Sequence, residues 1–100
     1  FKNEIIGMAF YYIKYSTWEG KCLFLEDFIV RQKYRSKRVG SKLFESIIKI
    51  AKETNMNRIM WQVLSWNKPA IYFYKKYNAE ISAEWLDGKI TKRQIENYNL

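Results

Sequence analysis

The chain has 100 residues, 48% of them hydrophobic and 18% aromatic, which fits one small folded domain and excludes a disordered segment. It contains one cysteine and no histidine, which excludes an internal disulfide, serine–histidine or cysteine–histidine catalysis and histidine-ligated zinc within the chain. No apolar run reaches the ~20 residues of a membrane span and no secretory signal pattern is present, so we expect a cytoplasmic protein.

The positive charge is concentrated in one place. The formal net charge is +8, and the range 31–42, here called the basic segment, holds six cations and no acidic residue. These are Arg31, Lys33, Arg35, Lys37, Arg38 and Lys42. A local positive segment predicts an anionic partner at one site, whereas a uniformly basic surface favours nucleic acid or membrane. A solvated charge run without a partner is the alternative.

The first half of the chain predicts a β-hairpin. The chain begins at Phe1 in what already resembles a strand, so we expect that an amino-terminal portion is missing or that a partner replaces it. Ile5–Tyr15 is rich in β-branched and aromatic residues and is predicted as a strand, and Ser16–Lys21 as the turn. Cys22–Val30 is nearly continuously apolar, which indicates a central strand covered on both faces. Its cysteine is expected to be a buried, inert thiol.

Glu26 and Asp27 interrupt this apolar strand. Neighbouring side chains in a strand point to opposite faces, so one of the two carboxylates should enter the interior. A β-bulge at this position would instead splay the next strand away and open a gap. Two solvated charges at a strand irregularity are the alternative to a functional pair.

A helix of about Val39–Thr54 follows, with one apolar stripe at helical spacing. The stripe consists of Leu43, Phe44, Ile47, Ile48 and Ala51. The range 55–57 breaks the helix, and Ile59–Leu64 is predicted as a strand that contains Trp61 and Gln62. Asn67 is the expected N-cap of a short helix that ends near Lys76.

The remaining elements complete an α/β fold. Asn78 is expected to adopt the left-handed conformation that ends the short helix. Ala79–Ile90 is predicted to hold a last strand around Trp85, and the capping-box pattern at Thr91–Gln94 a terminal helix. We therefore predict an α/β domain with a mixed central sheet and helical crossovers.

The basic segment lies between the central strand and the first long helix. Unpaired N–H groups and the positive end of a helix dipole favour phosphate at such a position. Side-chain cations turn this site into a clamp suited to a pyrophosphate, and Gly40 permits close approach of the backbone.

Three separated blocks carry a resemblance to a known family. Tyr34–Leu43 (YRSKRVGSKL) resembles the pyrophosphate-binding motif Q/R-x-x-G-x-G/A of the GNAT family of N-acetyltransferases. Leu25–Phe28 is similar to the strand that leads into that motif, and Trp66–Lys76 to the family's block around its catalytic tyrosine. The match is closest to the diamine and polyamine acetyltransferases. It implies the carboxy-terminal part of a GNAT-like acyl-CoA N-acyltransferase fold, one domain over residues 1–100, and a homodimer.

The resemblance implies acetyl-CoA as co-substrate and no metal. The cofactor-binding residues that it implies are Phe28, Ile29, Val30, Arg35, Ser36, Lys37, Arg38, Val39, Gly40, Ser41, Asn67 and Tyr74. Ser36 and Arg38 stand where the family commonly has glycine. Arg38 is the more serious departure, because its side chain either swings outward and adds charge or narrows the groove.

The chemistry of acetyl transfer assigns two further roles. An amine must lose a proton, and Glu26 is the candidate base, directly or through water. The thiolate must gain one, and the resemblance assigns this role to Tyr74, for which a core tyrosine is the alternative. Candidate substrate-binding residues are Glu26, Asp27, Trp61 and Gln62. A buried aromatic is the alternative for Trp61, and Trp18, Trp66 and Trp85 are expected in the core or an interface.

We therefore expect an enzyme that moves an acetyl group from acetyl-CoA to a primary amine of a small molecule, such as a polyamine, a diamine or a lysine-like amino acid. A non-catalytic CoA-binding or dimerisation module of the same fold is the first alternative. Nucleic-acid binding through the basic segment is the second. It is disfavoured because the segment is short and holds few aromatic residues for stacking.

Overall fold

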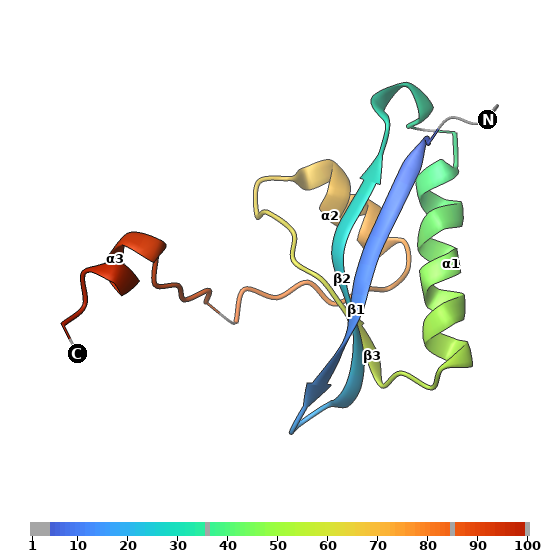
Figure 1. Cartoon of the computed structure of the whole chain (residues 1–100). Coiled ribbons are helices and arrows are strands. Elements are labelled where there is room, and N and C mark those ends of the chain that lie inside the picture. Colours follow the sequence, from blue (N-terminus) through green and yellow to red (C-terminus); the bar gives the residue numbers. More distant parts are fainter. Residues whose placement is uncertain (1–4, 36, 85, 100) are drawn as a thin grey trace. The chain divides into compact units, whose positions relative to one another are not determined.

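The computed structural model describes residues 5–35, 37–84 and 86–99. The elements in chain order are β1 (Gly7–Ser16), β2 (Gly20–Val30), the 3-10 helix η1 (Gln32–Tyr34), α1 (Val39–Glu53), β3 (Arg58–Met60), α2 (Lys68–Lys75) and α3 (Lys92–Glu96) (Figure 1). The chain forms two compact units, residues 1–62 and residues 63–100. No helix in the described ranges is both long and apolar enough to cross a membrane.

The first unit is a mixed sheet with the strand order β1-β2-β3. β2 pairs with β1 in antiparallel and with β3 in parallel orientation, so the continuously apolar strand is central, as predicted. Cys22 and Leu23 on β2 are fully buried, which confirms the buried thiol. A parallel pair needs a crossover connection, and α1 provides it between β2 and β3. The predicted α/β class with a mixed sheet is therefore confirmed.

α1 covers one face of this sheet (Figure 1). It begins at the predicted residue, and Phe44, Ile47 and Ala51 of the predicted stripe are buried. The Phe44 ring contacts Phe28 of β2 with centroids 5.7 Å apart. It also contacts Trp61 at 5.6 Å, so one aromatic side chain joins the helix to two parts of the sheet unit.

In the second unit the predicted helix boundaries hold. The Asn67 side chain accepts a hydrogen bond from the amide of Ala70 and caps α2. Asn78 has φ +61°, the left-handed conformation expected after that helix. Thr91 and Gln94 form the reciprocal capping box of α3. These elements depend on local signals, which explains why the sequence predicts them well.

Two strand predictions are wrong: one strand is shorter than predicted, and the other is absent from the described residues. β3 ends at Met60, so Trp61 and Gln62 follow the strand instead of lying in it. The described residues of the range 79–90 form no strand, and Leu86 (92% exposed) and Ile90 (70% exposed) bury little surface. A strand requires a partner as well as a pattern, and no described segment pairs with this one.

For Trp18 and Trp66 the structure contradicts the predicted place in the core, and a place in an interface stays a prediction. Trp18 is 92% exposed and Trp66 is 71% exposed, so neither belongs to the core. Trp18 lies in the turn between β1 and β2, and Trp66 in the turn before α2. Trp85 lies outside the described residues.

Candidate functional site

A β-bulge on β2 lies at the predicted position. Phe10 is paired with Asp27 and Tyr11 with Leu25, so Glu26 is an extra residue in the β2 strand. Both carboxylates are exposed. The expectation that one enters the interior is therefore wrong, because the extra residue breaks the alternation of side chains. In the ranges that the structure describes, neither carboxylate forms an ion pair or a side-chain hydrogen bond.

The two faces of the sheet are assigned by contacts. Phe28 contacts α1 through Phe44, and a Cβ at Gly7 would lie 3.5 Å from the Leu43 side chain of α1. The even-numbered residues of β1 therefore face away from α1. Phe10 is one of these residues, and its cross-strand partner Asp27 shares that face.

Near its carboxyl end, β2 is paired with β1 but no longer with β3. β3 pairs only with Cys22–Phe24, whereas β1 follows β2 as far as Val30. The last part of β2, which contains the predicted contacts Phe28, Ile29 and Val30, therefore extends beyond the β3 ladder. Such a strand end can receive an extended ligand that carries amide groups, as an added strand would.

The connection from β2 to α1 folds back on the end of β2. Arg31 accepts a hydrogen bond from the amide of Tyr34 at 2.9 Å, and Gln32 from the amide of Arg35 at 3.2 Å. The Arg35 side chain donates through Nε to the Val30 carbonyl at 3.1 Å. The guanidinium is thus anchored at the carboxyl end of the central strand. Ser36, the next predicted contact, lies outside the described residues.

The amino terminus of α1 has the features that favour an anion. The helix has no side-chain cap and no acidic residue in its first turn. The first-turn amides of Val39, Gly40 and Ser41 point along the helix axis, as in every α-helix. Lys37 and Lys42 beside them are exposed. The positive end of the helix dipole adds to these two cations.

Arg38 precedes this helix in the left-handed conformation, with φ +62°. The backbone therefore has, at this position, the geometry for which the family uses glycine. The Arg38 guanidinium lies 3.8 Å from the Glu45 carboxylate on α1. Its side chain is 72% exposed, so this ion pair contributes little to stability, but it shows that the side chain is turned outward along the helix.

Trp61 and Gln62 follow β3 in the same unit. Trp61 is half-buried against Phe44, in agreement with the alternative that it is a packing residue, and Gln62 is exposed. The first unit therefore brings together the bulge, the end of β2, the basic segment, the start of α1 and Trp61. Asn67 and Tyr74 belong to the second unit.

Tyr74 is the buried residue of α2, with 7% of its surface exposed. Its ring meets Phe73 at a centroid distance of 5.4 Å. Burial raises the pKa of the Tyr74 phenol above its ordinary value near 10, because the phenolate is poorly solvated. The phenol is therefore fully protonated at neutral pH, as a general acid must be.

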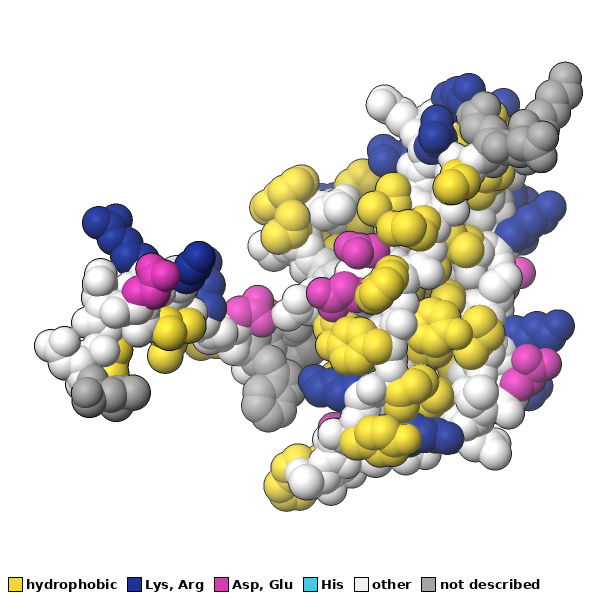
Figure 2. Space-filling model, in the orientation of Figure 1, with side chains coloured by type: hydrophobic (Ala, Val, Ile, Leu, Met, Phe, Trp, Pro, Cys, Tyr) yellow, Lys and Arg dark blue, Asp and Glu magenta, His cyan; other side chains and the backbone are white. Residues whose placement is uncertain are grey.

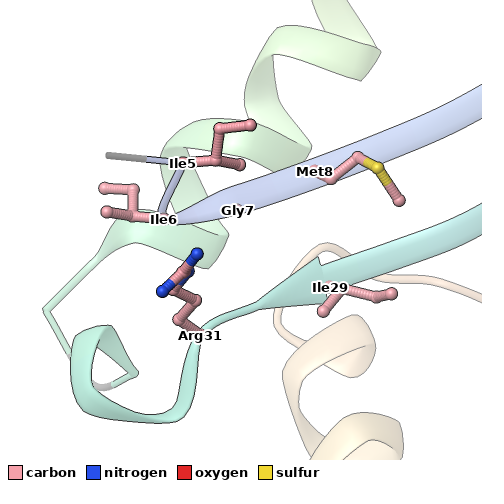
Figure 3. A pocket seen from close by; sticks show the side chains of 6 residues that line it. All are labelled: Ile5, Ile6, Gly7, Met8, Ile29 and Arg31. Carbon is pink, nitrogen blue, oxygen red and sulfur yellow. The ribbon is translucent and has the colours of Figure 1, made fainter. Parts of the chain in front are cut away.

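A hydrophobic pocket of about 210 Å³, which the sequence did not predict, lies where β1 begins and β2 ends (Figure 3). Ile5, Ile6, Met8 and Ile29 line it, and Figure 3 shows the Arg31 side chain pointing toward Ile6. Arg31 is thus a pocket residue as well as a cation of the basic segment. The described residues contain no group of three or more Cys, Asp or Glu that could hold a metal ion.

Comparisons with known families, proteins and solved structures show what the chain is similar to. Residues 1–79 match the model of the acetyltransferase (GNAT) family. Over 76 residues the chain is 36% identical to thialysine N-epsilon-acetyltransferase of Bos taurus, covering 76% of this chain and 45% of that protein. It is 36% identical over 80 residues to spermidine/spermine N(1)-acetyltransferase-like protein 1 of Homo sapiens, covering 79% of this chain and 12% of that protein.

Among solved structures, an integron cassette protein of V. cholerae superposes with a TM-score of 0.81 at 25% identity, over 91% of this chain and 57% of that one. The chain spans less than half the length of the related thialysine and spermidine/spermine-type proteins. The family match covers most of the chain and includes the bulge, the basic segment, α1 and the tyrosine helix. The chain therefore belongs to the GNAT family of acetyltransferases.

Proposed function

We propose that this chain forms the acetyl-CoA-binding part of an enzyme that acetylates the primary amine of a small molecule. The observation that carries the proposal is the uncapped start of α1 beside exposed cations, directly after a central strand that extends beyond its neighbour. A diphosphate fits the first feature, and an extended arm with amide groups fits the second. Coenzyme A contains both.

In this proposal the diphosphate binds the amides of Val39, Gly40 and Ser41, with Arg35, Lys37 and Arg38 as cations around it. The pantetheine arm runs along Phe28–Val30, and Asn67 is a further proposed contact of the cofactor. One acetyl-CoA-binding domain over residues 1–100 is part of the proposal. A homodimer located in the cytoplasm is part of the same proposal.

The acetyl group moves by direct attack. The amine nitrogen forms a bond to the thioester carbon, and the carbon–sulfur bond breaks. Glu26, directly or through water, removes the proton that the amine must lose, and Tyr74 donates a proton to the departing thiolate. The relatives named for thialysine and for spermidine/spermine support an amine as acceptor. Asp27, Trp61 and Gln62 contact that amine substrate.

The test is thiol release from acetyl-CoA by the full-length protein with polyamines, diamines and lysine-like amino acids. Tyr74→Phe removes only the phenol oxygen and should lower kcat roughly 10²–10⁴-fold, the usual contribution of a general acid. Tyr72→Phe on the same helix is the matched control, because Tyr72 is 70% exposed, and it should retain wild-type kcat. Release of no coenzyme A with any amine, or equal kcat for the two variants, contradicts the proposal.

The second candidate is a non-catalytic module that binds coenzyme A or forms a dimer. The observation that favours it is Arg38, because a bulky residue stands here at a left-handed backbone position where the family commonly has glycine. Calorimetry with coenzyme A separates the two functions. Binding without turnover supports the module, whereas binding with turnover supports the enzyme.

A further inference from the structure

Two residues of the basic segment hold the carboxyl end of β2. Figure 2 shows Lys and Arg side chains gathered where β2 ends and α1 begins. The Arg31 amide donates to the Ile6 carbonyl at 2.8 Å and so extends the pairing with β1 by one residue. The Arg35 side chain donates through Nε to the Val30 carbonyl at 3.1 Å. One cation thus contacts the strand end through its backbone, and the other through its guanidinium.

The register of the sheet shows to which edge of β2 the backbone groups of Val30 point. Ile6 and Arg31 are joined by a backbone hydrogen bond, and one step along the ladder Gly7 lies opposite Val30. In an antiparallel ladder, pairs that exchange hydrogen bonds alternate with pairs that do not. Val30 therefore directs its N–H and C=O away from β1, toward the edge at which β3 pairs only with Cys22–Phe24. This is the edge to which an extended ligand can add.

Arg35 also closes the turn that follows the strand. Its backbone amide donates to the Gln32 carbonyl at 3.2 Å, while its side chain reaches back to Val30. A guanidinium carries its donors in a rigid planar fork, so a hydrogen bond from Nε fixes the orientation of the whole group. Lysine has the same charge but a flexible ammonium and no Nε–H. The contact with the strand end therefore requires arginine, and positive charge alone does not provide it.

We propose that Arg35 is a positioning residue for the amide-bearing arm of coenzyme A, in addition to its charge beside the diphosphate. The inference rests on the proposed function and divides the cations assigned to the cofactor into two kinds. Arg35 fixes the Val30 end of β2, where the arm adds to the strand. Lys37 is an exposed cation near the start of α1 and acts by charge. Loss of the Arg35 guanidinium therefore weakens binding of the arm even when the ligand carries no phosphate.

The test compares coenzyme A with pantetheine, which has the same arm but neither the diphosphate nor the nucleotide. Titrations of the full-length protein, followed by NMR amide shifts, measure the Kd of each ligand. Arg35→Gln and Arg35→Lys should both raise the Kd for pantetheine about three- to tenfold, because each removes the Nε donor. Lys37→Gln removes a charge and no contact with the strand. It should raise the Kd for coenzyme A and change that for pantetheine by about twofold or less.

Two further measurements separate positioning from a loss of folding. In the ligand-free protein, hydrogen exchange at the Tyr34 and Arg35 amides, which close η1, should become about three- to tenfold faster in both Arg35 variants. In turnover, the KM for acetyl-CoA should rise, while kcat and the KM for the amine keep their wild-type values. If kcat, both KM values and the melting temperature change together, Arg35 acts through the stability of the fold and the inference is wrong.

The outcomes separate this inference from the proposed function. If Arg35→Lys binds pantetheine like wild type, Arg35 acts by charge alone, and the inference is overturned while the acetyl-CoA-binding proposal stands. Wild-type protein that binds coenzyme A but not pantetheine at millimolar concentration has the same consequence, because the strand end then holds no arm. Wild-type protein that binds neither ligand overturns both the inference and the proposed function.

Discussion

Arg38 is the residue at which this chain departs most clearly from the family motif, and the structure separates its two effects. Its backbone is left-handed, which costs roughly 1–2 kcal/mol for a residue with a Cβ atom. Its side chain extends toward Glu45 and adds a cation beside the start of α1. The first effect concerns stability and the second concerns ligand binding, so two substitutions can measure them separately.

Arg38→Gly should increase the free energy of unfolding by about 1 kcal/mol, because glycine adopts positive φ without a Cβ clash. Arg38→Ala removes the same guanidinium but keeps the strained backbone, so it should not stabilise the protein. Urea unfolding measures both values. Both variants should weaken coenzyme A binding by a similar factor, since each loses one cation. Equal stability of the two variants would show that φ at this position is not strained.

At the scale of elements, the β1–β2 hairpin is tied to the loop before β3 through Gly20. Gly20 has φ +78°, and a Cβ there would lie 2.5 Å from Nδ2 of Asn57. Asn57 donates from this atom to the Glu19 carbonyl at 2.7 Å and from its backbone amide to the Lys21 carbonyl at 2.8 Å. One asparagine thus joins the turn region to the loop that leads into β3.

Gly20→Ala should lower the free energy of unfolding by about 2 kcal/mol, from backbone strain together with disturbance of the Asn57 hydrogen bond. Thermal unfolding measures the loss. Gly88→Ala is the matched control, because a Cβ at Gly88 meets nothing within 4 Å, and it should change stability by about 0.5 kcal/mol or less. If both variants melt at the same temperature, Asn57 does not hold the hairpin as described.

The elements that the sequence predicted well are those with local signals. α1 has an amphipathic period, and α2 has a capping asparagine, so their bounds agree with the structure to within about two residues. The strand expected at Ile59–Leu64 is shorter because its parallel ladder depends on β2, which is distant in the sequence. The strand expected within Ala79–Ile90 has an alternating pattern but no described partner.

In the candidate site, too, features set by neighbouring residues could be predicted from the sequence, and features set by distant parts of the chain could not. The bulge at Glu26 could be predicted, because two adjacent carboxylates in an apolar strand are a local anomaly. The pocket at Ile5 and Ile6 could not, since it depends on the place where β2 ends beside β1.

At the scale of the whole molecule, the net charge of +8 raises the question of how an anion is recognised. A diffuse positive field would attract coenzyme A and nucleic acid alike, and every lysine would contribute similarly. A local site would instead depend on the few cations near the start of α1. The chain carries exposed lysines in the basic segment, such as Lys37, and outside it, such as Lys92. The two explanations therefore predict different results when one lysine of each kind is replaced.

Lys37→Gln and Lys92→Gln lower the net charge by the same amount, but Lys37 lies in the basic segment and Lys92 in α3. We expect Lys37→Gln to raise the Kd for coenzyme A about three- to tenfold and to reduce its salt dependence, because it removes a cation that the proposed function assigns to the diphosphate. Lys92→Gln should leave both quantities unchanged. Calorimetric titrations at low and moderate salt measure the effect. Equal weakening by the two substitutions would mean that overall charge, and not the start of α1, attracts the ligand.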